Sequence, residues 1–352
     1  MFADMCSLGN LRLAFKKARK DKANKWYVKE FESNLENELL ELRTELETQT
    51  YKPKPLKRFV IRDPKTRVIH ASAFRDRVVH HAICNLIEPV FEKGFIHDTY
   101  ANRKGKGTHA ALRRLDVFER RVTKNGRLVI NAKDSNMVVG YALKADIKHY
   151  FSTVDHGVLM EILGKKIKDE RVLRLIKRVL DGYETNMHGK GMPLGNMTSQ
   201  FFANVYLNEL DHFVKHTLKA KYYIRYVDDF VILHRSKEKL LSYKWMISNF
   251  LARLKIELHP EKSKVAPLHN GLSFLGFRVF YHYKLPRRSN MRKLERKLGF
   301  EIYSGTGSAR TFSENVKKFL DGWFGYAMHG NTYKLRKRIT ERMQTPNSRC
   351  GS

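Results

Sequence analysis

Cysteine and proline are scarce in this chain of 352 residues, which contains three of the former and nine of the latter. Cys6, Cys84 and Cys350 lie far apart and lack the spacing of a zinc site or a disulfide framework, which favours a reducing compartment. No run of about 18 apolar residues occurs, and the N-terminus lacks an apolar segment long enough for a signal peptide. These absences argue against disulfide-stabilised secreted proteins and membrane-spanning proteins. We therefore expect a soluble, cytoplasmic protein.

Acidic residues are also in deficit, since 36 Asp and Glu face 68 Lys and Arg, for a formal charge of +32. Such a surplus repels itself in a compact chain unless a polyanion neutralises it. Nucleic acid is the first candidate, because phosphates bound by a protein release their counterions. An anionic membrane surface and a plain solubility bias are the alternatives. The basic residues are interleaved with aromatic residues along the whole chain, and this favours nucleic acid.

The periodicity of the apolar residues predicts a chain of mixed helices and strands. Spacings of three and four predict a helix over residues 27–48, and alternation predicts a hairpin within 51–70 that turns near Asp63 and Pro64. A strand is predicted to end at Asp146, and a glycine-rich loop over 188–200 leads into a further helix. From about residue 285 onward the chain is basic and mostly helical in pattern.

Two adjacent carboxylates, Asp228 and Asp229, stand between two runs of β-branched and aromatic residues in YIRYVDDFVIL (223–233). Both runs predict strands, so the pair falls in a tight hairpin turn. Aspartate is a good turn residue, which alone would explain an isolated pair. The strand-end Asp146 supplies a third carboxylate, and carboxylates brought together repel one another unless a cation neutralises them. Oxygen ligands without a nearby His or Cys favour Mg²⁺, with Mn²⁺ as the alternative ion.

Three carboxylates in a chain of charge +32 fit one reaction well. Two metal ions about 3.5–4 Å apart activate a 3′-hydroxyl and stabilise the leaving pyrophosphate in an in-line displacement. The order along the chain is consistent with this, because a strand-end aspartate is followed by a glycine loop, a helix and the Asp-Asp hairpin. The pattern therefore favours templated nucleotidyl transfer.

Several motifs, in this order along the chain, resemble those of reverse transcriptases. The palm is matched by YVDD together with the upstream ADIKHYF, and the fingers signature of bacterial members is matched by KTRVIHASAFRDRVVHHAI. YANRKGKGTHAAL resembles the next block of the family. HPEKSK resembles the lysine-bearing motif that follows the active-site hairpin, and FLGF resembles the primer grip. Each motif is weak alone, whereas the ordered set is specific.

The resemblance covers roughly residues 50–345 and implies an α+β, right-hand polymerase fold with fingers, a palm of antiparallel sheet plus helices, and a helical thumb. The glycine loop would lie between fingers and palm. The implied domains are an N-terminal helical extension (1–50), fingers (51–135), palm (136–284), basic helical thumb (285–345) and disordered tail (346–352).

The same resemblance implies catalytic roles for five residues. Asp146, Asp228 and Asp229 would hold two metal ions, with the backbone of Ile147 beside the metal and the incoming nucleotide. Lys262 would donate a proton to the leaving pyrophosphate; a loop lysine without a role is the alternative.

Five further residues are implied in binding nucleotide or primer. Phe151 matches the aromatic gate that excludes a ribose 2′-hydroxyl, and a core aromatic is its alternative reading. Arg62 and Arg67 fall where fingers residues clamp the triphosphate, although surface arginines on strands need no such role. Tyr226 and Gly276 would support the primer and template, and Tyr226 is otherwise a core residue.

The glycine loop departs from the pattern of intron reverse transcriptases. In GMPLGNMTSQFFAN, Leu194 replaces their glutamine and Ser199-Gln200 replaces their Ser-Pro, and both Leu194 and Gln200 would lie at the nucleotide. This resembles the enzymes of diversity-generating retroelements, which copy a template-repeat RNA with errors at adenines so that the cDNA rewrites a variable gene (mutagenic retrohoming). Leu194 lacks the amide that braces the nucleotide, so base-pair checking should relax, unless the leucine is a neutral packing substitute.

The implied partners are template RNA, a primer or cDNA strand, deoxynucleoside triphosphates and a small, basic, oligomeric accessory protein. Helix 27–48 and the basic thumb are the candidate surfaces for that protein, and the compartment is the cytoplasm of a bacterial or phage-infected cell. A retron-like, intron-derived or phage-defence reverse transcriptase is the first alternative. The second is a non-catalytic RNA-binding scaffold, which the intact Asp146, Asp228 and Asp229 disfavour.

Overall fold

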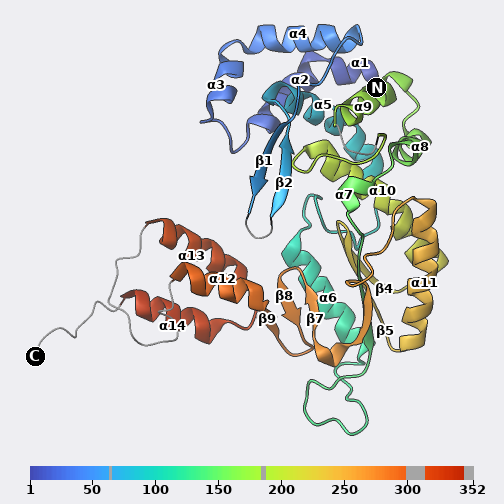
Figure 1. The fold of residues 1–352 in the computed structure, drawn as a ribbon, viewed down its shortest axis with the longest axis vertical. Helices are drawn as coiled ribbons and strands as arrows, with labels where there is room; N and C mark the ends of the chain where they lie inside the picture. The colour runs from blue at the N-terminus through green and yellow to red at the C-terminus, as the bar shows by residue number, and fades with distance from the viewer. Residues whose placement is uncertain (63–65, 184–187, 299–313, 345–352) are drawn as a thin grey trace, which may run out of the picture. The chain divides into compact units, whose positions relative to one another are not determined.

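The structure is a computed structural model that describes residues 1–62, 66–183, 188–298 and 314–344. The chain divides into two compact units (Figure 1). The first comprises Met1–Gly107, Ala145–Val231 and Leu241–Lys264, and the second comprises Thr108–Lys144, Ile232–Leu240 and Val265–Ser352.

Helices make up most of the first unit. Its core includes an aromatic cluster in which Phe15, Phe31 and Phe74 contact one another from three different helices. The helices of this unit are α1 (Phe2–Cys6), α2 (Leu8–Arg19), α3 (Trp26–Ser33), α4 (Leu35–Glu47), α5 (Phe74–Glu92), α7 (Tyr150–Thr153), α8 (His156–Lys166), α9 (Glu170–Asp181), α10 (Met197–His212) and the π-helix Phe213–Thr217.

The single helix predicted over 27–48 is wrong, because α3 ends before Asn34 and α4 begins after it. Asn34 leaves helical geometry, with φ of −124° and ψ of 33°. The Ser33 hydroxyl donates to the Glu30 carbonyl at 2.8 Å, and serine and asparagine side chains that bond nearby backbone favour helix ends. The apolar period continues across the break, so periodicity alone could not locate it.

The predicted hairpin within 51–70 is confirmed as β1 (Lys57–Ile61) paired antiparallel with β2 (Arg67–Ala71). Ile61 pairs with Arg67 at the turn end, while Asp63 and Pro64 lie outside the described residues. Every residue of β1 is exposed, and the hairpin projects from the helices of its unit (Figure 1).

A four-stranded sheet has the strand order β4-β5-β3-β6. Its strands are β3 (Tyr141–Asp146), β4 (Tyr222–Tyr226), β5 (Asp229–His234) and β6 (Lys264–Pro267). The unit boundary passes within β3, β5, β6 and helix α11 (Lys237–Arg253). The predictions that a strand ends at Asp146 and that a hairpin surrounds YVDD are both confirmed.

The second unit contains a small antiparallel sheet and the helices of the basic C-terminal region. Its elements are α6 (Thr108–Val122), the 3₁₀ turn Leu268–Asn270, β7 (Leu272–Phe274), β8 (Phe277–Val279), β9 (Lys284–Pro286), α12 (Arg288–Leu298), α13 (Glu314–Ala327) and α14 (Tyr333–Gln344). Leu294, Leu320, Trp323 and Ile339 form a core between the last three helices. The predicted tail over 346–352 lies outside the described residues. Among the helices described, none combines the length and hydropathy required to cross a bilayer.

Candidate active site

The YVDD segment forms the turn between β4 and β5. Val227 and Asp228 connect the two strands, and Val227 has a φ of 55°. This left-handed conformation is unfavourable for a β-branched residue. The carbonyl of Asp228 accepts a hydrogen bond from the amide of Ile147 at 3.3 Å. Because Ile147 directly follows β3, this bond attaches the end of that strand to the turn of the hairpin.

Asp146 is held at the end of β3 by the segment that contains Lys262. The carbonyl of Asp146 accepts a hydrogen bond from the amide of His259 at 2.7 Å, and its amide lies 3.4 Å from the Ser263 hydroxyl. The Nζ of Lys262 lies 3.4 Å from Oδ2 of Asp146. The structure therefore brings together a carboxylate and a lysine that are 116 positions apart in the numbering of the chain.

The pKa of Asp228 reports the electrostatics of this site. Burial raises it above the usual range, and the negative charge of Asp146 raises it further. The positive charges of Lys262 and Arg67 act in the opposite direction. Asp146 and Asp228 are therefore close enough to repel one another, and two cationic side chains partly compensate for the repulsion.

A divalent cation suits this pair, because it would remove the cost of ionising two neighbouring carboxylates and because oxygen donors are the ligands that Mg²⁺ prefers. Asp229 opens β5 and is partly buried. Across the described ranges, no group of three or more His, Cys, Asp or Glu side chains is arranged to hold a metal ion. The metal ligands therefore remain a prediction, supported by the repulsion between Asp146 and Asp228.

The glycine loop is attached to the first hairpin. The amide of His70 on β2 donates to the carbonyl of Leu194 at 3.0 Å. Gly195 has a φ of 115°, and a Cβ at that position would lie only 2.8 Å from Cγ2 of Ile69. A side chain at this position would therefore collide with the Ile69 side chain and would also be strained by the positive φ. This close approach places the backbone of Leu194 against β2, the strand that also carries Arg67.

Three other predicted residues lie at the edges of these elements. Gln200 lies in the first turn of α10 and is partly buried. Its backbone amide donates to the carbonyl of Asn196 at 3.3 Å. Phe151 is partly exposed, unlike the adjacent Tyr150, which is buried and donates from its hydroxyl to the Ala203 carbonyl at 2.7 Å. Tyr226 ends β4 and is also partly exposed. Their roles at the nucleotide or the primer remain predictions.

Of the two predicted arginines, Arg67 acts electrostatically on the site. Arg67 is exposed at the start of β2, and its charge lowers the pKa of Asp228. Arg62 is exposed beyond the end of β1, and its contact with the nucleotide remains a prediction. Gly276 belongs to the second unit, where it has a φ of 89° in the turn between β7 and β8 and its carbonyl accepts a hydrogen bond from Tyr326. Its role at the primer is likewise untested.

Sequence reasoning missed Arg225 and Asp211, which form a fully buried ion pair directly beneath the YVDD turn. The available signal was an arginine in the middle of the otherwise apolar strand YYIRY. A buried charge requires a partner, so this arginine predicted a buried carboxylate.

Comparison with known proteins agrees with this geometry. Residues 53–279, more than half of the chain, match the reverse transcriptase (RNA-dependent DNA polymerase) family. Protein YkfC of Escherichia coli strain K12 is 26% identical over 290 residues, which cover 70% of this chain and 72% of YkfC. The group II intron-encoded protein LtrA of Lactococcus lactis is 24% identical over 315 residues, which cover 69% of this chain and 50% of LtrA. A solved structure of telomerase from Candida albicans, in complex with a TWJ fragment of telomeric RNA, is 12% identical, with a TM-score of 0.48 over 85% of this chain and 56% of that one.

The family match, together with the mixed fold of helices and antiparallel sheets, defines a polymerase of the right-hand class. The chain belongs to the reverse transcriptase (RNA-dependent DNA polymerase) family, and its relatives include group II intron-encoded proteins. This confirms the predicted fold class and the predicted enzyme class. The chain spans only half the length of LtrA.

Proposed function

We propose that the protein is the RNA-directed DNA polymerase of a diversity-generating retroelement, which copies a template-repeat RNA into cDNA with errors concentrated at adenines. The observation that carries the proposal is the loop sequence, in which Leu194-Gly195 and Ser199-Gln200 stand where intron enzymes have Gln-Gly and Ser-Pro. The attachment of this loop to β2 supports it, because the Leu194 backbone is fixed beside the strand that carries Arg67.

In the proposed reaction, the primer 3′-hydroxyl oxygen forms a bond to the α-phosphorus of a deoxynucleoside triphosphate, and pyrophosphate leaves. Asp146, Asp228 and Asp229, with the backbone of Ile147, would hold the metal ions. Two Mg²⁺ ions, or Mn²⁺, would lower the pKa of the hydroxyl and neutralise the charge that develops on the pyrophosphate. Lys262 would give a proton to the pyrophosphate, and its 3.4 Å approach to Asp146 supports a place beside the metal ligands.

Relaxed fidelity would arise because the Leu194 side chain cannot form hydrogen bonds. An amide at this position donates and accepts hydrogen bonds, whereas an aliphatic side chain contributes only packing. A mispaired nucleotide would therefore lose fewer hydrogen bonds relative to a correct one. Because the backbone is fixed by His70 and Gly195, Leu194→Gln tests the side chain without a change of loop length.

An intron-derived enzyme is the second candidate, favoured by the likeness to LtrA. A retron-like or a phage-defence reverse transcriptase belongs to the same class of alternatives. A non-catalytic RNA-binding scaffold is disfavoured by the carboxylates at the hairpin, whose repulsion serves no purpose without a cation.

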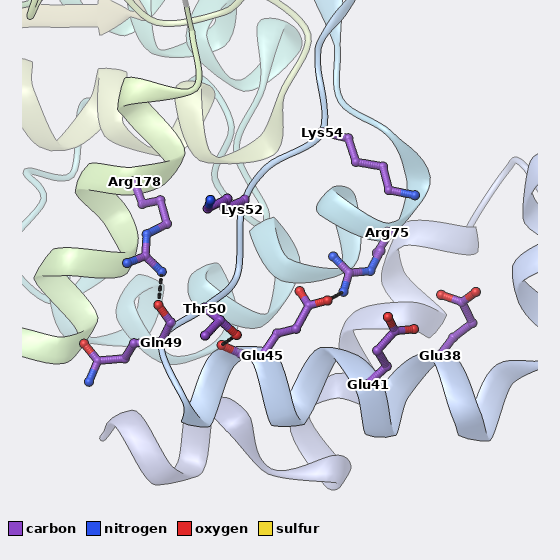
Figure 2. Close-up of a pocket in the computed structure, with 9 residues that line it drawn as sticks. All are labelled: Glu38, Glu41, Glu45, Gln49, Thr50, Lys52, Lys54, Arg75 and Arg178. Carbon is purple, nitrogen blue, oxygen red and sulfur yellow. Dashed lines mark hydrogen bonds and ion pairs between the residues drawn. The ribbon is translucent and has the colours of Figure 1, made fainter.

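The proposed partners are template RNA, the primer or cDNA strand, deoxynucleoside triphosphates and a small basic accessory protein in the cytoplasm. The candidate surface for the accessory protein includes α4, which borders a pocket of about 740 Å³ (Figure 2). The carboxylates of Glu38, Glu41 and Glu45 lie along the α4 side of this pocket. Glu45 is paired with Arg75, whereas Glu38 and Glu41 have no ion-pair partner among the described residues. Lys52, Lys54, Arg75 and Arg178 also line the pocket, so it offers side chains of both charges to a partner.

Primer extension on an RNA template containing all four bases, followed by sequencing of the cDNA, tests this function. We expect wild-type errors to concentrate opposite adenine, and Leu194→Gln to lower the adenine error frequency severalfold, roughly the effect of one restored hydrogen bond. Leu194→Met is the matched control and should keep the errors, because it conserves volume without adding an amide. Accurate wild-type cDNA would leave the polymerase class intact and contradict the retroelement assignment.

A further inference from the structure

A buried charged network lies beneath the YVDD turn, and the proposed reaction does not use it. Arg225 on β4 and Asp211 on α10 are fully buried and form a bidentate ion pair, with Nε–Oδ1 and Nη2–Oδ2 distances of 2.7 and 2.6 Å. The Tyr223 hydroxyl donates to Oδ1 of Asp211 at 2.6 Å, and the Thr99 hydroxyl donates to Oδ2 at 2.8 Å. Each carboxylate oxygen of Asp211 therefore accepts two hydrogen bonds.

The remaining nitrogen of the guanidinium contacts the turn itself. Nη1 of Arg225 donates to the carbonyl of Val227 at 2.9 Å, and to Oδ1 of Asn204 at 3.2 Å. Val227 is the left-handed residue that directly precedes Asp228. A residue in an unfavourable conformation persists only where its surroundings hold it, and here the guanidinium binds its carbonyl.

The backbone of Arg225 is fixed as well. Its amide donates to the carbonyl of Asp98, and its carbonyl accepts from the amide of Tyr100, each at 3.0 Å. Arg225 is therefore held at both ends, by two hydrogen bonds to its backbone and by the bonds of its guanidinium to Asp211. A donor fixed in this way determines where the Val227 carbonyl can point.

Stability alone does not require an ion pair at this position. Removing two charges from water is costly, and a buried ion pair can often be replaced by well-packed apolar residues without loss of stability. An apolar pair of similar volume, however, has no hydrogen to donate to the Val227 carbonyl. This contact is what distinguishes the ion pair from an apolar substitute.

We propose that Arg225 and Asp211 are positioning residues that hold the Val227–Asp228 turn in the conformation needed for nucleotidyl transfer. The turn is then held from two sides, because Arg225 binds the Val227 carbonyl and the Ile147 amide binds the Asp228 carbonyl. Asp211 acts through Arg225, whose guanidinium it orients. This inference rests on the proposed polymerase function, and its test includes a measurement that does not need activity.

The test compares the double variant Arg225→Met with Asp211→Leu against wild type. Replacing both partners avoids the stranded buried charge that a single substitution would leave. The control is Tyr51→Phe, which removes a buried hydrogen bond of 2.8 Å to Asp76 in the same unit, away from the hairpin in sequence. Arg225→Lys is a second variant, because it keeps a positive charge for Asp211 but cannot reproduce the fork that reaches Val227.

Two quantities are measured, the kinetics of primer extension and the hydrogen-exchange rate of the Ile147 amide. The buried hydroxyls of Tyr223 and Thr99 lose their acceptor in the double variant, so we expect it to melt below wild type while it remains folded. Its kcat should be lowered about tenfold or more, with the nucleotide KM within about twofold, since positioning acts on the reacting geometry. Exchange at Ile147 should accelerate by a similar factor, because its acceptor is no longer held. For Arg225→Lys, both kcat and the exchange rate at Ile147 should lie between those of wild type and the double variant. Tyr51→Phe should change neither quantity.

A folded double variant with wild-type kcat and wild-type exchange would overturn the proposal. If the double variant does not fold, the same two measurements on Arg225→Lys test the proposal, and wild-type kcat with wild-type exchange in that variant would overturn it. If wild type makes no cDNA, the proposed function fails, while exchange at Ile147 still decides the positioning role: faster exchange in the variants supports it, and unchanged exchange overturns it.

Discussion

The hairpins β1–β2 and β4–β5 both carry predicted site residues, yet they are stabilised in opposite ways. All five residues of β1 are exposed, and Arg67 at the start of β2 is exposed as well. In the second hairpin, Tyr223, Ile224 and Phe230 are completely buried. The first hairpin therefore presents its cations to solvent, whereas the second holds its carboxylates on a packed strand pair.

This difference matches two different tasks. A group that joins in bond making must lie within a fraction of an ångström of its place, and burial supplies that constraint. A group that captures a charged substrate must reach solvent. Its segment makes few buried contacts and is therefore free to adjust. The comparison therefore predicts that changes in the buried hairpin reduce the rate of chemistry, and that changes in the exposed hairpin reduce substrate binding.

The largest effect is expected from the buried hairpin. Asp228→Ala combined with Asp229→Ala should lower the rate of cDNA synthesis roughly a thousandfold or more, because the metal ligands proposed here act as one unit. The measurement is primer extension at saturating nucleotide and Mg²⁺. Asp321→Asn, which alters an exposed carboxylate on α13, is the control and should leave synthesis unchanged. Activity in the double variant would show that the hairpin does not hold catalytic metal.

A smaller effect, on binding, is expected from the exposed hairpin. Arg67→Ala should raise the nucleotide KM by about 10–100-fold, the scale of one or two charge-assisted hydrogen bonds, with a smaller change in kcat. Its melting temperature should change only slightly, because the side chain is exposed. Arg58→Ala removes the same charge from the same hairpin and serves as the control. Equal effects of the two variants would mean that only the overall charge of the hairpin matters.

Local patterns in the sequence were enough to place the strand end at Asp146 and the turn at Asp228, because alternation and turn residues act over a few positions. They could not place Arg225 against Asp211, because that pairing joins a strand to a helix and depends on packing. The approach of Gly195 to Ile69 is likewise a contact between distant segments. The break at Asn34 was missed for another reason, since the apolar period on both sides of it is the same. The role of Lys262 came from resemblance, and the structure adds its contact with Asp146.

The smallest effect expected is one of pH on stability, and it separates the two hairpins once more. Burial and the charge of Asp146 raise the pKa of Asp228 in the folded protein. Between the ordinary pKa of this carboxyl and its raised value, the unfolded chain has released a proton that the folded protein retains. The free energy of unfolding therefore falls as pH rises through that window, and below the ordinary pKa no penalty remains.

Asp228→Asn cannot ionise, so it should melt above wild type at pH 7 without metal and close to wild type near pH 4. A change of about 1 kcal/mol moves the melting temperature of a large domain by about 2–4 °C, which is the scale expected. Mg²⁺ should raise the melting temperature of wild type but not of the variant, because a bound cation replaces the missing proton. Arg67→Gln on the exposed hairpin should shift stability in the opposite direction, because it removes a charge that lowers the pKa of Asp228. It should melt slightly below wild type at pH 7 without metal and close to wild type near pH 4. If Asp228→Asn melts below wild type at pH 7 without metal, the carboxylate is stabilising, and the repulsion that supports a metal site at this hairpin is absent.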